Sequence, residues 1–274
     1  MDARPIGVFD SGVGGLTVLH ECLVTLPHED FIYFGDSHPE RFPYGPKPAA
    51  TIRRFAHEIA SHLEALDVKL IVVACNSATA AALPGLQREF RVPLVGVITP
   101  EAHAAVQATR TRRVGVMATR ATVDSGRYAD AVLALDAGVA VTQVACPRLV
   151  PLIQEGAVDG QELLDAAREY AAPLKQAGCD TVILGCTHYP LIRPTLQRIF
   201  GRGVTLITSA EEVAREDADT LGRRSVGNDP DREGGYRFLC TGEPEAFRSV
   251  ASRFLQLPLG GVEQVDPAAL EVAA

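Results

Sequence analysis

Two segments that end in a cysteine follow one pattern, and this repeat constrains the fold more than any other feature. Residues 70–77, LIVVACNS, align with residues 181–188, TVILGCTH, so that Cys75 corresponds to Cys186, 111 positions later. Each cysteine follows a short apolar run that is typical of a buried strand. The pattern predicts a duplicated α/β unit in which both cysteines end a strand.

A second pair of segments supports the duplication. Residues 6–11 match residues 114–119 at an offset of 108, and short β-branched runs alternate with helical patterns along the chain. This alternation is typical of parallel sheets covered by helices. We therefore predict an α/β fold of two pseudo-symmetric parallel-sheet domains, with helices on both faces and a site in the cleft between them. The predicted strands are Ile6–Phe9, Phe31–Phe34, Leu70–Ala74, Leu94–Val97, Val114–Met117, Val139–Val144, Thr181–Gly185, Val204–Ile207 and Arg237–Cys240.

Composition narrows the function classes. The 274 residues are 47% hydrophobic and 22% charged, which excludes a disordered chain, and the net charge of −8 gives no overall field to attract nucleic acid or a membrane surface. The amino terminus carries no secretory signal pattern, and polar residues interrupt the longest uncharged stretch, residues 70–87, so we expect a cytoplasmic protein. The six cysteines include no CxxC pair, which argues against a zinc ribbon or a disulfide framework and predicts no metal.

A cleft with one thiol on each wall could work on both faces of one carbon. A thiolate on one side would remove a proton while a thiol on the other supplies one, which inverts a stereocentre without a cofactor. Cys75 and Cys186 each precede a predicted helix, at residues 77–90 and 190–200 respectively, and helix amino termini lower a thiol pKa. Asp10 and His188 are candidate proton acceptors, although Asp10 could equally cap the following helix. No lysine has a setting that suggests a pyridoxal Schiff base, so we predict no cofactor.

Two turns could hold a carboxylate. The glycine cluster in residues 10–15, DSGVGG, follows a predicted strand, but it lacks the third glycine of a dinucleotide fingerprint and the lysine of a P-loop. A turn rich in backbone N–H groups is the simpler interpretation. Pro43-Tyr44-Gly45 is either a second such turn or a surface β-turn.

Four motifs in this order resemble the cofactor-independent glutamate racemases, within the aspartate/glutamate/hydantoin racemase group. They are DSGVGGLTV at residues 10–18, PYG at residues 43–45, ACN at residues 74–76 and GCTHYP at residues 185–190. The resemblance covers most of the chain. It implies a first domain of residues 1–98 plus 209–274 and a second domain of residues 99–208. It also implies a homodimer that makes D-glutamate for peptidoglycan, although no residue pattern fixes an interface.

The resemblance also implies residue roles. Cys75 would take the α-proton of D-glutamate and Cys186 that of L-glutamate, assisted by Asp10 and His188 respectively. A small-molecule substrate would be held by the four residues just named together with Ser11, Pro43, Tyr44, Gly45, Asn76, Ser77, Thr119, Thr122 and Thr187.

The sequence departs from the family pattern in three places. Ser77 replaces the usual threonine, the segment 35–44 is two residues longer, and Gln154 stands where a glutamate often occurs, with Glu155 next to it. Two alternatives stay open: a racemase for aspartate or another amino acid, and a catalytically silent amino-acid-binding protein. His188 favours glutamate, because aspartate racemases of this group usually carry an acidic residue at that position.

Overall fold

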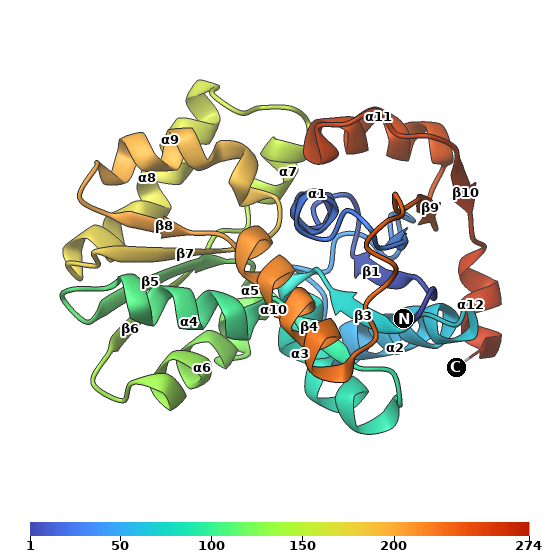
Figure 1. Ribbon diagram of the computed structural model, residues 1–274. Coiled ribbons are helices and arrows are strands. Elements are labelled where there is room, and N and C mark those ends of the chain that lie inside the picture. Colours follow the sequence, from blue (N-terminus) through green and yellow to red (C-terminus); the bar gives the residue numbers. More distant parts are fainter. Residues whose placement is uncertain (274) are drawn as a thin grey trace.

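The computed structural model describes residues 1–273 and contains two parallel β-sheets that lie side by side (Figure 1). The first sheet has the strand order β10-β9-β2-β1-β3-β4, and the second has the order β6-β5-β7-β8. The strands are β1 (Ile6–Asp10), β2 (Phe31–Gly35), β3 (Leu70–Val73), β4 (Leu94–Gly96), β5 (Arg113–Ala118), β6 (Ala140–Ala145), β7 (Thr181–Gly185), β8 (Thr205–Ile207), β9 (Tyr236–Cys240) and β10 (Val262–Gln264). The predicted α/β class with two parallel sheets is confirmed.

The duplication is visible in the strand order. Four strands of the first sheet run β2-β1-β3-β4, and the second sheet repeats this order as β6-β5-β7-β8. In the first sheet Phe9 of β1 lies beside Val73 of β3, and in the second Met117 of β5 lies beside Leu184 of β7. The two cysteines therefore follow corresponding strands, β3 and β7, each next to the first strand of its half.

Helices cover both faces of the sheets. They are α1 (Leu16–Thr25), α2 (Ala49–Ala65), α3 (Asn76–Glu89), α4 (Ile98–Ala108), α5 (Arg120–Asp124), α6 (Arg127–Leu135), α7 (Leu149–Gln154), α8 (Gln161–Gln176), α9 (Arg193–Phe200), α10 (Ser209–Arg224), α11 (Pro244–Leu255) and α12 (Pro267–Ala273). Successive residues of β1 alternate between two cores: Ile6 and Val8 belong to the core that contains α1, and Phe9 belongs to the core that contains α2. Strands buried on both faces explain the nearly continuous apolar runs in the sequence.

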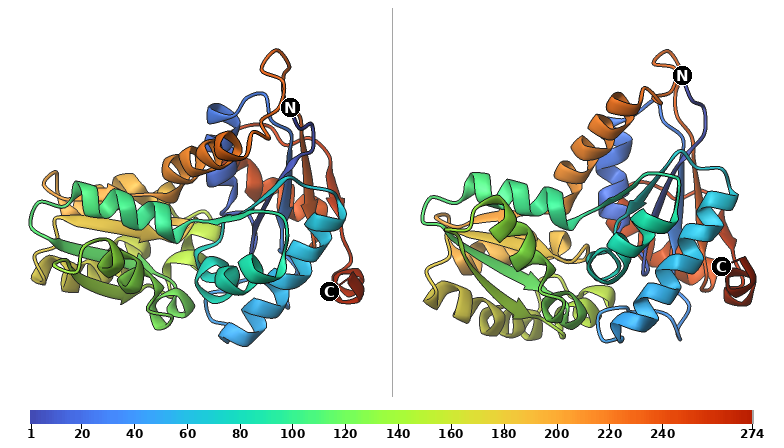
Figure 2. Two further views of the ribbon diagram at one scale, coloured as in Figure 1. Left: turned by 60° about the horizontal axis from the view of Figure 1, so that its bottom comes forward. Right: turned by 90° about the horizontal axis from the view of Figure 1, so that it is seen from below.

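The chain returns to the first sheet after completing the second. Helix α10, orange in Figure 1, packs against α1 and α4, and β9 then pairs with β2. Figure 2 shows both termini on the side of the first sheet, away from the second. The domain boundaries at residues 98/99 and 208/209 stay a prediction. No helix within residues 1–273 has the length and apolar character needed to cross a bilayer.

Two local features differ from the sequence-based expectation. The sequence does not predict strand β10, because Glu263 and Gln264 are exposed and the strand has only three residues. The helix expected over residues 190–200 is divided into a 3₁₀ turn, Tyr189–Ile192, and α9. Pro194 lies in the first turn of α9, where the missing N–H of proline costs no helical hydrogen bond.

Candidate active site

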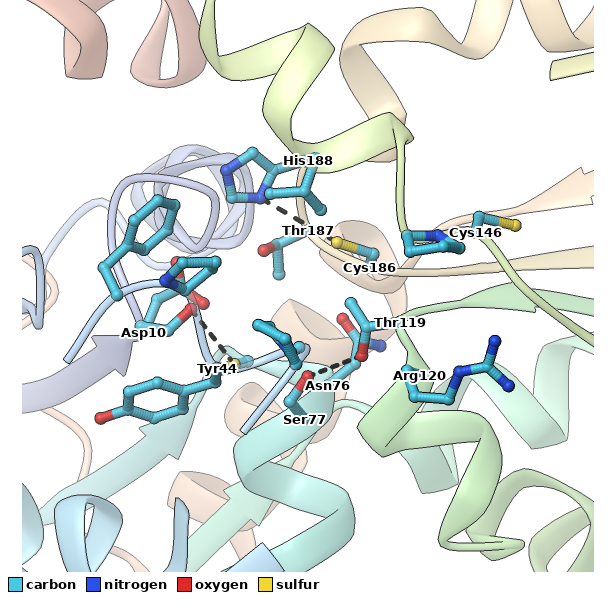
Figure 3. A pocket seen from close by; sticks show the side chains of 18 of the residues that line it. Asp10, Tyr44, Asn76, Ser77, Thr119, Arg120, Cys146, Cys186, Thr187 and His188 are labelled. Carbon is cyan, nitrogen blue, oxygen red and sulfur yellow. Dashed lines mark hydrogen bonds between the residues drawn. The ribbon is translucent and has the colours of Figure 1, made fainter. Parts of the chain in front are cut away.

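A cavity opens where the strands of the two sheets end (Figure 3). Both repeat cysteines line it. Of the predicted site residues, every one except Thr122 lines this cavity. The lining residues are Asp10, Ser11, Phe42, Pro43, Tyr44, Gly45, Pro46, Cys75, Asn76, Ser77, Thr119, Arg120, Cys146, Pro147, Val150, Pro151, Cys186, Thr187 and His188. The fold therefore assembles residues that lie far apart in the sequence into one site.

On the first wall, Cys75 lies two residues after the end of β3 and is the N-cap residue of α3. Its S–H group donates to Ser11 Oγ at 3.7 Å, and the side chain of Asp10, the last residue of the adjacent strand β1, also interacts with the thiol. The Asp10 carboxylate accepts the Gly12 N–H at 3.1 Å, while α1 begins later, after Gly15. Asp10 thus organises the turn before the helix and faces Cys75, and it does not cap α1 itself.

On the second wall, Cys186 follows β7 and lies 4.0 Å from His188, measured from Sγ to Nδ1 (Figure 3). The other ring nitrogen, Nε2, lies 3.0 Å from Gln154 Oε1. Because an amide oxygen only accepts, Nε2 carries the hydrogen, and Nδ1 presents its lone pair to the thiol. The unusual Gln154, and not its neighbour Glu155, is therefore the side chain that contacts Nε2 of His188.

Burial dominates the pKa values of this site. It raises the pKa of Cys75 to about 12 and that of Cys186 well above its ordinary value, and backbone N–H groups at Ala78 and His188 only partly offset this. The expectation that helix amino termini lower both thiol pKa values is wrong, because desolvation of the thiolate outweighs the N–H groups. Burial also raises the pKa of Asp10 to about 6 and lowers that of His188 to about 4.

Three hydroxyl groups form a chain across the two halves. Ser77 Oγ lies 2.9 Å from Thr119 Oγ1, and Thr119 Oγ1 lies 3.0 Å from Thr122 Oγ1. Thr122 is fully buried behind Thr119 and does not line the cavity. The serine that replaces the usual threonine keeps its hydroxyl in this chain, and Thr122 orients Thr119 from behind.

The longer segment 35–44 is held by a buried ion-pair network. Arg41 contacts Asp36 at 2.7 Å and Glu58 at 2.6 Å, and its guanidinium lies 3.9 Å from the centre of the Phe55 ring. The Tyr44 hydroxyl also donates to Asp36, so the Tyr44 side chain is turned toward this network. The turn at residues 43–45 is therefore fixed in place at the cavity.

The glycine cluster serves the contact between the two halves. A Cβ atom at Gly14 would overlap Thr187 Oγ1 and would lie 2.5 Å from His188 Nδ1. Thr17 Oγ1 also lies 3.3 Å from the Thr187 carbonyl oxygen. Glycine at position 14 thus lets the segment that carries His188 approach the turn that carries Asp10.

Sequence reasoning does not identify seven of the lining residues: Phe42, Pro46, Arg120, Cys146, Pro147, Val150 and Pro151. Cys146 carries a usable signal, because it also follows a strand of the second half, β6. Its S–H group donates to the Val144 carbonyl oxygen at 3.4 Å, and its sulfur points away from Cys186 (Figure 3).

Within the part of the chain that the structure describes, the cavity has a single cationic side chain and no metal-binding cluster. Among the described residues, Arg120 is the only lysine or arginine that lines the cavity. Within residues 1–273, no group of three or more His, Cys, Asp or Glu side chains is arranged to hold a metal ion.

Known proteins resemble this chain in sequence and in fold. The sequence model of the Asp/Glu/Hydantoin racemase family matches residues 16–216. A protein named glutamate racemase from Parafrankia sp. (strain EAN1pec) is 47% identical over 270 residues, which cover 98% of this chain and 96% of that relative.

Solved structures agree with this assignment. Glutamate racemase isoform RacE1 from Bacillus anthracis superposes with a TM-score of 0.93 at 37% identity, covering 97% of this chain and 99% of that one. Glutamate racemase from Francisella tularensis in complex with D-glutamate gives a TM-score of 0.90 at 37% identity, covering 97% and 98%. Together with the cavity and its two thiols, these matches show that the chain belongs to the Asp/Glu/Hydantoin racemase family of enzymes.

Proposed function

We propose that this enzyme is a glutamate racemase that moves the α-proton between Cys75 and Cys186 without a cofactor and supplies D-glutamate for peptidoglycan. The observation that carries the proposal is the position of the two thiols, which follow corresponding strands and line one cavity. Each thiol has its own proton acceptor, Asp10 or His188. The relatives named above as glutamate racemases support the choice of substrate.

The two thiols are the groups that exchange protons with the α-carbon. With L-glutamate, the Cys186 thiolate removes the α-proton, and the electron pair of the C–H bond stays on the α-carbon. The Cys75 thiol then delivers its proton to the opposite face of this carbon, which gives D-glutamate. Cys186 ends protonated and Cys75 ends as the thiolate, so the reverse reaction starts from the state that the forward reaction leaves.

Deprotonation of the thiols depends on the bound substrate as well as on their partners, because both thiol pKa values lie far above those of the acceptors. In the free site both thiols are protonated near neutral pH, since burial disfavours the thiolates. Asp10, with a pKa near 6, is ionised at pH 7 and can take the Cys75 proton, and neutral His188 can take the Cys186 proton at Nδ1. The ammonium group of the substrate further stabilises whichever thiolate forms.

The walls of the cavity supply complementary charge and hydrogen bonds for an amino acid. Asp10 provides a carboxylate for the ammonium group, and Oδ1 of Asp10 has no hydrogen-bond partner in the described part of the chain. Ser11, Ser77, Thr119 and Thr187 provide hydroxyl groups for the two carboxylates. Hydrogen bonds to the α-carboxylate stabilise the negative charge that develops as the α-carbon loses its proton.

The test is isotope exchange by the purified, pyridoxal-free protein. L-Glutamate in D2O should lose optical rotation and gain deuterium at the α-carbon. Exchange with L-aspartate in place of L-glutamate would contradict the proposed substrate. Exchange with neither amino acid, while D-glutamate still binds in calorimetry, would contradict racemase activity and indicate a silent binding protein.

A further inference from the structure

A buried hydrogen-bonded trio behind the cavity connects the two walls. Glu101 of α4 and Tyr128 of α6 are both fully buried, and neither lines the cavity. Asn76, the first residue of α3, does line it and is 2% exposed. Asn76 Nδ2 donates to Glu101 Oε2 at 3.1 Å and to the Tyr128 hydroxyl at 2.7 Å, and the Tyr128 hydroxyl donates to Glu101 Oε2.

These contacts fix the orientation of the Asn76 amide through one of its N–H groups. Glu101 Oε2 and the Tyr128 hydroxyl are themselves hydrogen-bonded, so they lie on the same side of Nδ2 and share one N–H, because the two N–H bonds of a primary amide diverge by about 120°. The Asn76 carbonyl oxygen, Oδ1, is left without a partner in the described part of the chain. The fixed amide therefore holds an unpaired acceptor at the cavity, and such an acceptor suits an ammonium group and not a carboxylate.

The trio also reaches the second thiol. The ring of Tyr128 packs against Gly185, where a Cβ atom would lie 2.9 Å from Cε2 of the ring. Gly185 directly precedes Cys186, and Asn76 directly follows Cys75. One tyrosine thus contacts the neighbours of both thiols, from an element that belongs to the second half.

We propose that Glu101 and Tyr128 are positioning residues that lock the Asn76 amide with its oxygen toward the substrate ammonium group. This inference rests on the proposed function and deepens it. Without the two acceptors, the Asn76 amide is free to rotate, and its N–H donors then compete for the substrate carboxylate or point at the ammonium. Glu101 is held as an uncharged group, because burial raises its pKa well above its ordinary value, and so glutamine is its closest mimic.

The test is a double-mutant cycle on kcat/KM for glutamate. Tyr128→Phe alone should lower kcat/KM by about tenfold, since one hydrogen bond that fixes Asn76 is lost. In an Asn76→Ala background the same change should lower kcat/KM by less than about twofold, because the amide it positions is gone. An equal loss in the two backgrounds would overturn the proposal.

Three further variants separate positioning from simple destabilisation. Tyr189→Phe is the matched control: Tyr189 is equally buried but donates to the Cys146 carbonyl oxygen at 3.4 Å, so its effect should be the same with and without the Asn76→Ala substitution. Glu101→Gln should retain kcat/KM within about threefold, whereas Glu101→Leu should match Tyr128→Phe or exceed it. Comparable losses of kcat/KM in both Glu101 variants would contradict the proposal that Glu101 acts as the hydrogen-bond acceptor for Asn76.

Failure of this inference is distinguishable from failure of the proposed function. Wild-type racemisation of glutamate is measured first and tests the function alone. If the wild type binds D-glutamate without racemising it, the cycle is run on the calorimetric Kd, where the same dependence on Asn76 is expected. Additive effects on Kd would then overturn the positioning role by themselves.

Discussion

The two halves of the molecule place their cysteines at corresponding positions but give them different partners. In the repeat, Asp10 of the first half corresponds to Ala118, and His188 of the second half corresponds to Ser77. The first thiol is thus served by a carboxylate on the adjacent strand, and the second by an imidazole two residues further along the chain. In the proposed mechanism each half carries one proton acceptor, and neither carries both.

The difference matters because the two partners differ in charge. At pH 7 Asp10 is an anion, and its charge is one cause of the raised pKa of Cys75. His188 is neutral at the same pH, since burial lowers its pKa to about 4 and Gln154 adds no charge. The pair of walls therefore carries one negative charge beside the α-carbon, which complements the single ammonium group of an amino acid.

The largest expected effect comes from removing either thiol. Cys75→Ala and Cys186→Ala should each lower the racemisation rate by about 10³-fold or more, because each removes one of two obligatory proton carriers. Binding of glutamate should stay measurable by calorimetry in both variants. Unchanged turnover in either variant would show that racemisation does not need one thiol from each half.

The second-largest effect is expected from removing the carboxylate of Asp10. The wild-type kcat/KM should fall below a pH of about 6, where Asp10 becomes protonated and cannot take the Cys75 proton. Asp10→Asn should lower kcat/KM by about 10²-fold at pH 8 and abolish this acid limb. The loss must be equal in both directions, because the equilibrium constant of a racemisation is 1.

The primary deuterium isotope effect on kcat/KM distinguishes the two walls. In Asp10→Asn this isotope effect should increase for α-deuterated D-glutamate, whose α-proton goes to Cys75. In His188→Asn it should increase for α-deuterated L-glutamate. The reverse pattern would show that the partners are assigned to the wrong thiols.

A smaller effect is expected from giving the second wall a charge. Gln154→Glu should raise the pKa of His188, because a carboxylate would replace the amide oxygen 3.0 Å from Nε2. Since a protonated His188 cannot accept the Cys186 proton, kcat/KM should fall by up to about tenfold near pH 6, where the wild type keeps His188 neutral. Glu155→Gln is the matched control and should leave the pH profile unchanged. An unaltered profile for Gln154→Glu would show that Gln154 does not tune His188.

The smallest effect on turnover is expected from a buried carboxylate outside the site. Asp217 of α10 accepts the Cys22 S–H at 3.5 Å, and burial raises its pKa from 3.8 to about 8. The folded protein therefore binds one more proton than the unfolded chain between these pH values, and stability falls as the pH rises from about 4 to 8.

Asp217→Asn removes this pH dependence, because asparagine resembles the neutral acid. The variant should have a Tm roughly 5 °C or more above that of the wild type at pH 8, with the difference vanishing near pH 4. Its kcat/KM should match that of the wild type. This result would show that replacing a buried carboxylate does not by itself lower activity, so the loss in Asp10→Asn is specific to the site. A lower Tm at pH 8 would contradict the raised pKa of Asp217.

The sequence predicts most strands, and the position of the two cysteines after a strand, because both features depend on local patterns. The runs before Cys75 and Cys186 are apolar and short, and the repeat places them in equivalent positions. Other features depend on tertiary contacts that no local pattern encodes. The raised thiol pKa values arise from burial by both halves, and the contact between Gln154 and His188 joins α7 to the segment after β7.

The cavity residues that the sequence does not identify also depend on tertiary contacts. Arg120 lies in a segment whose sequence carries no motif, and only the folding of the second sheet brings it to the cavity. Thr122 shows the opposite case, because the family resemblance implies that it holds the substrate, whereas α5 directs it into the protein. Which side of a short helix faces a cavity is set by its packing.

The measurement that tests the central claim most directly is stereospecific exchange by the two cysteine variants in D2O. Cys75→Ala retains Cys186 and should introduce deuterium into L-glutamate without inversion, while D-glutamate stays unlabelled. Cys186→Ala should label D-glutamate only. Exchange of both enantiomers by one variant, or of the opposite enantiomer by each, would contradict the assignment of one thiol to each face of the α-carbon.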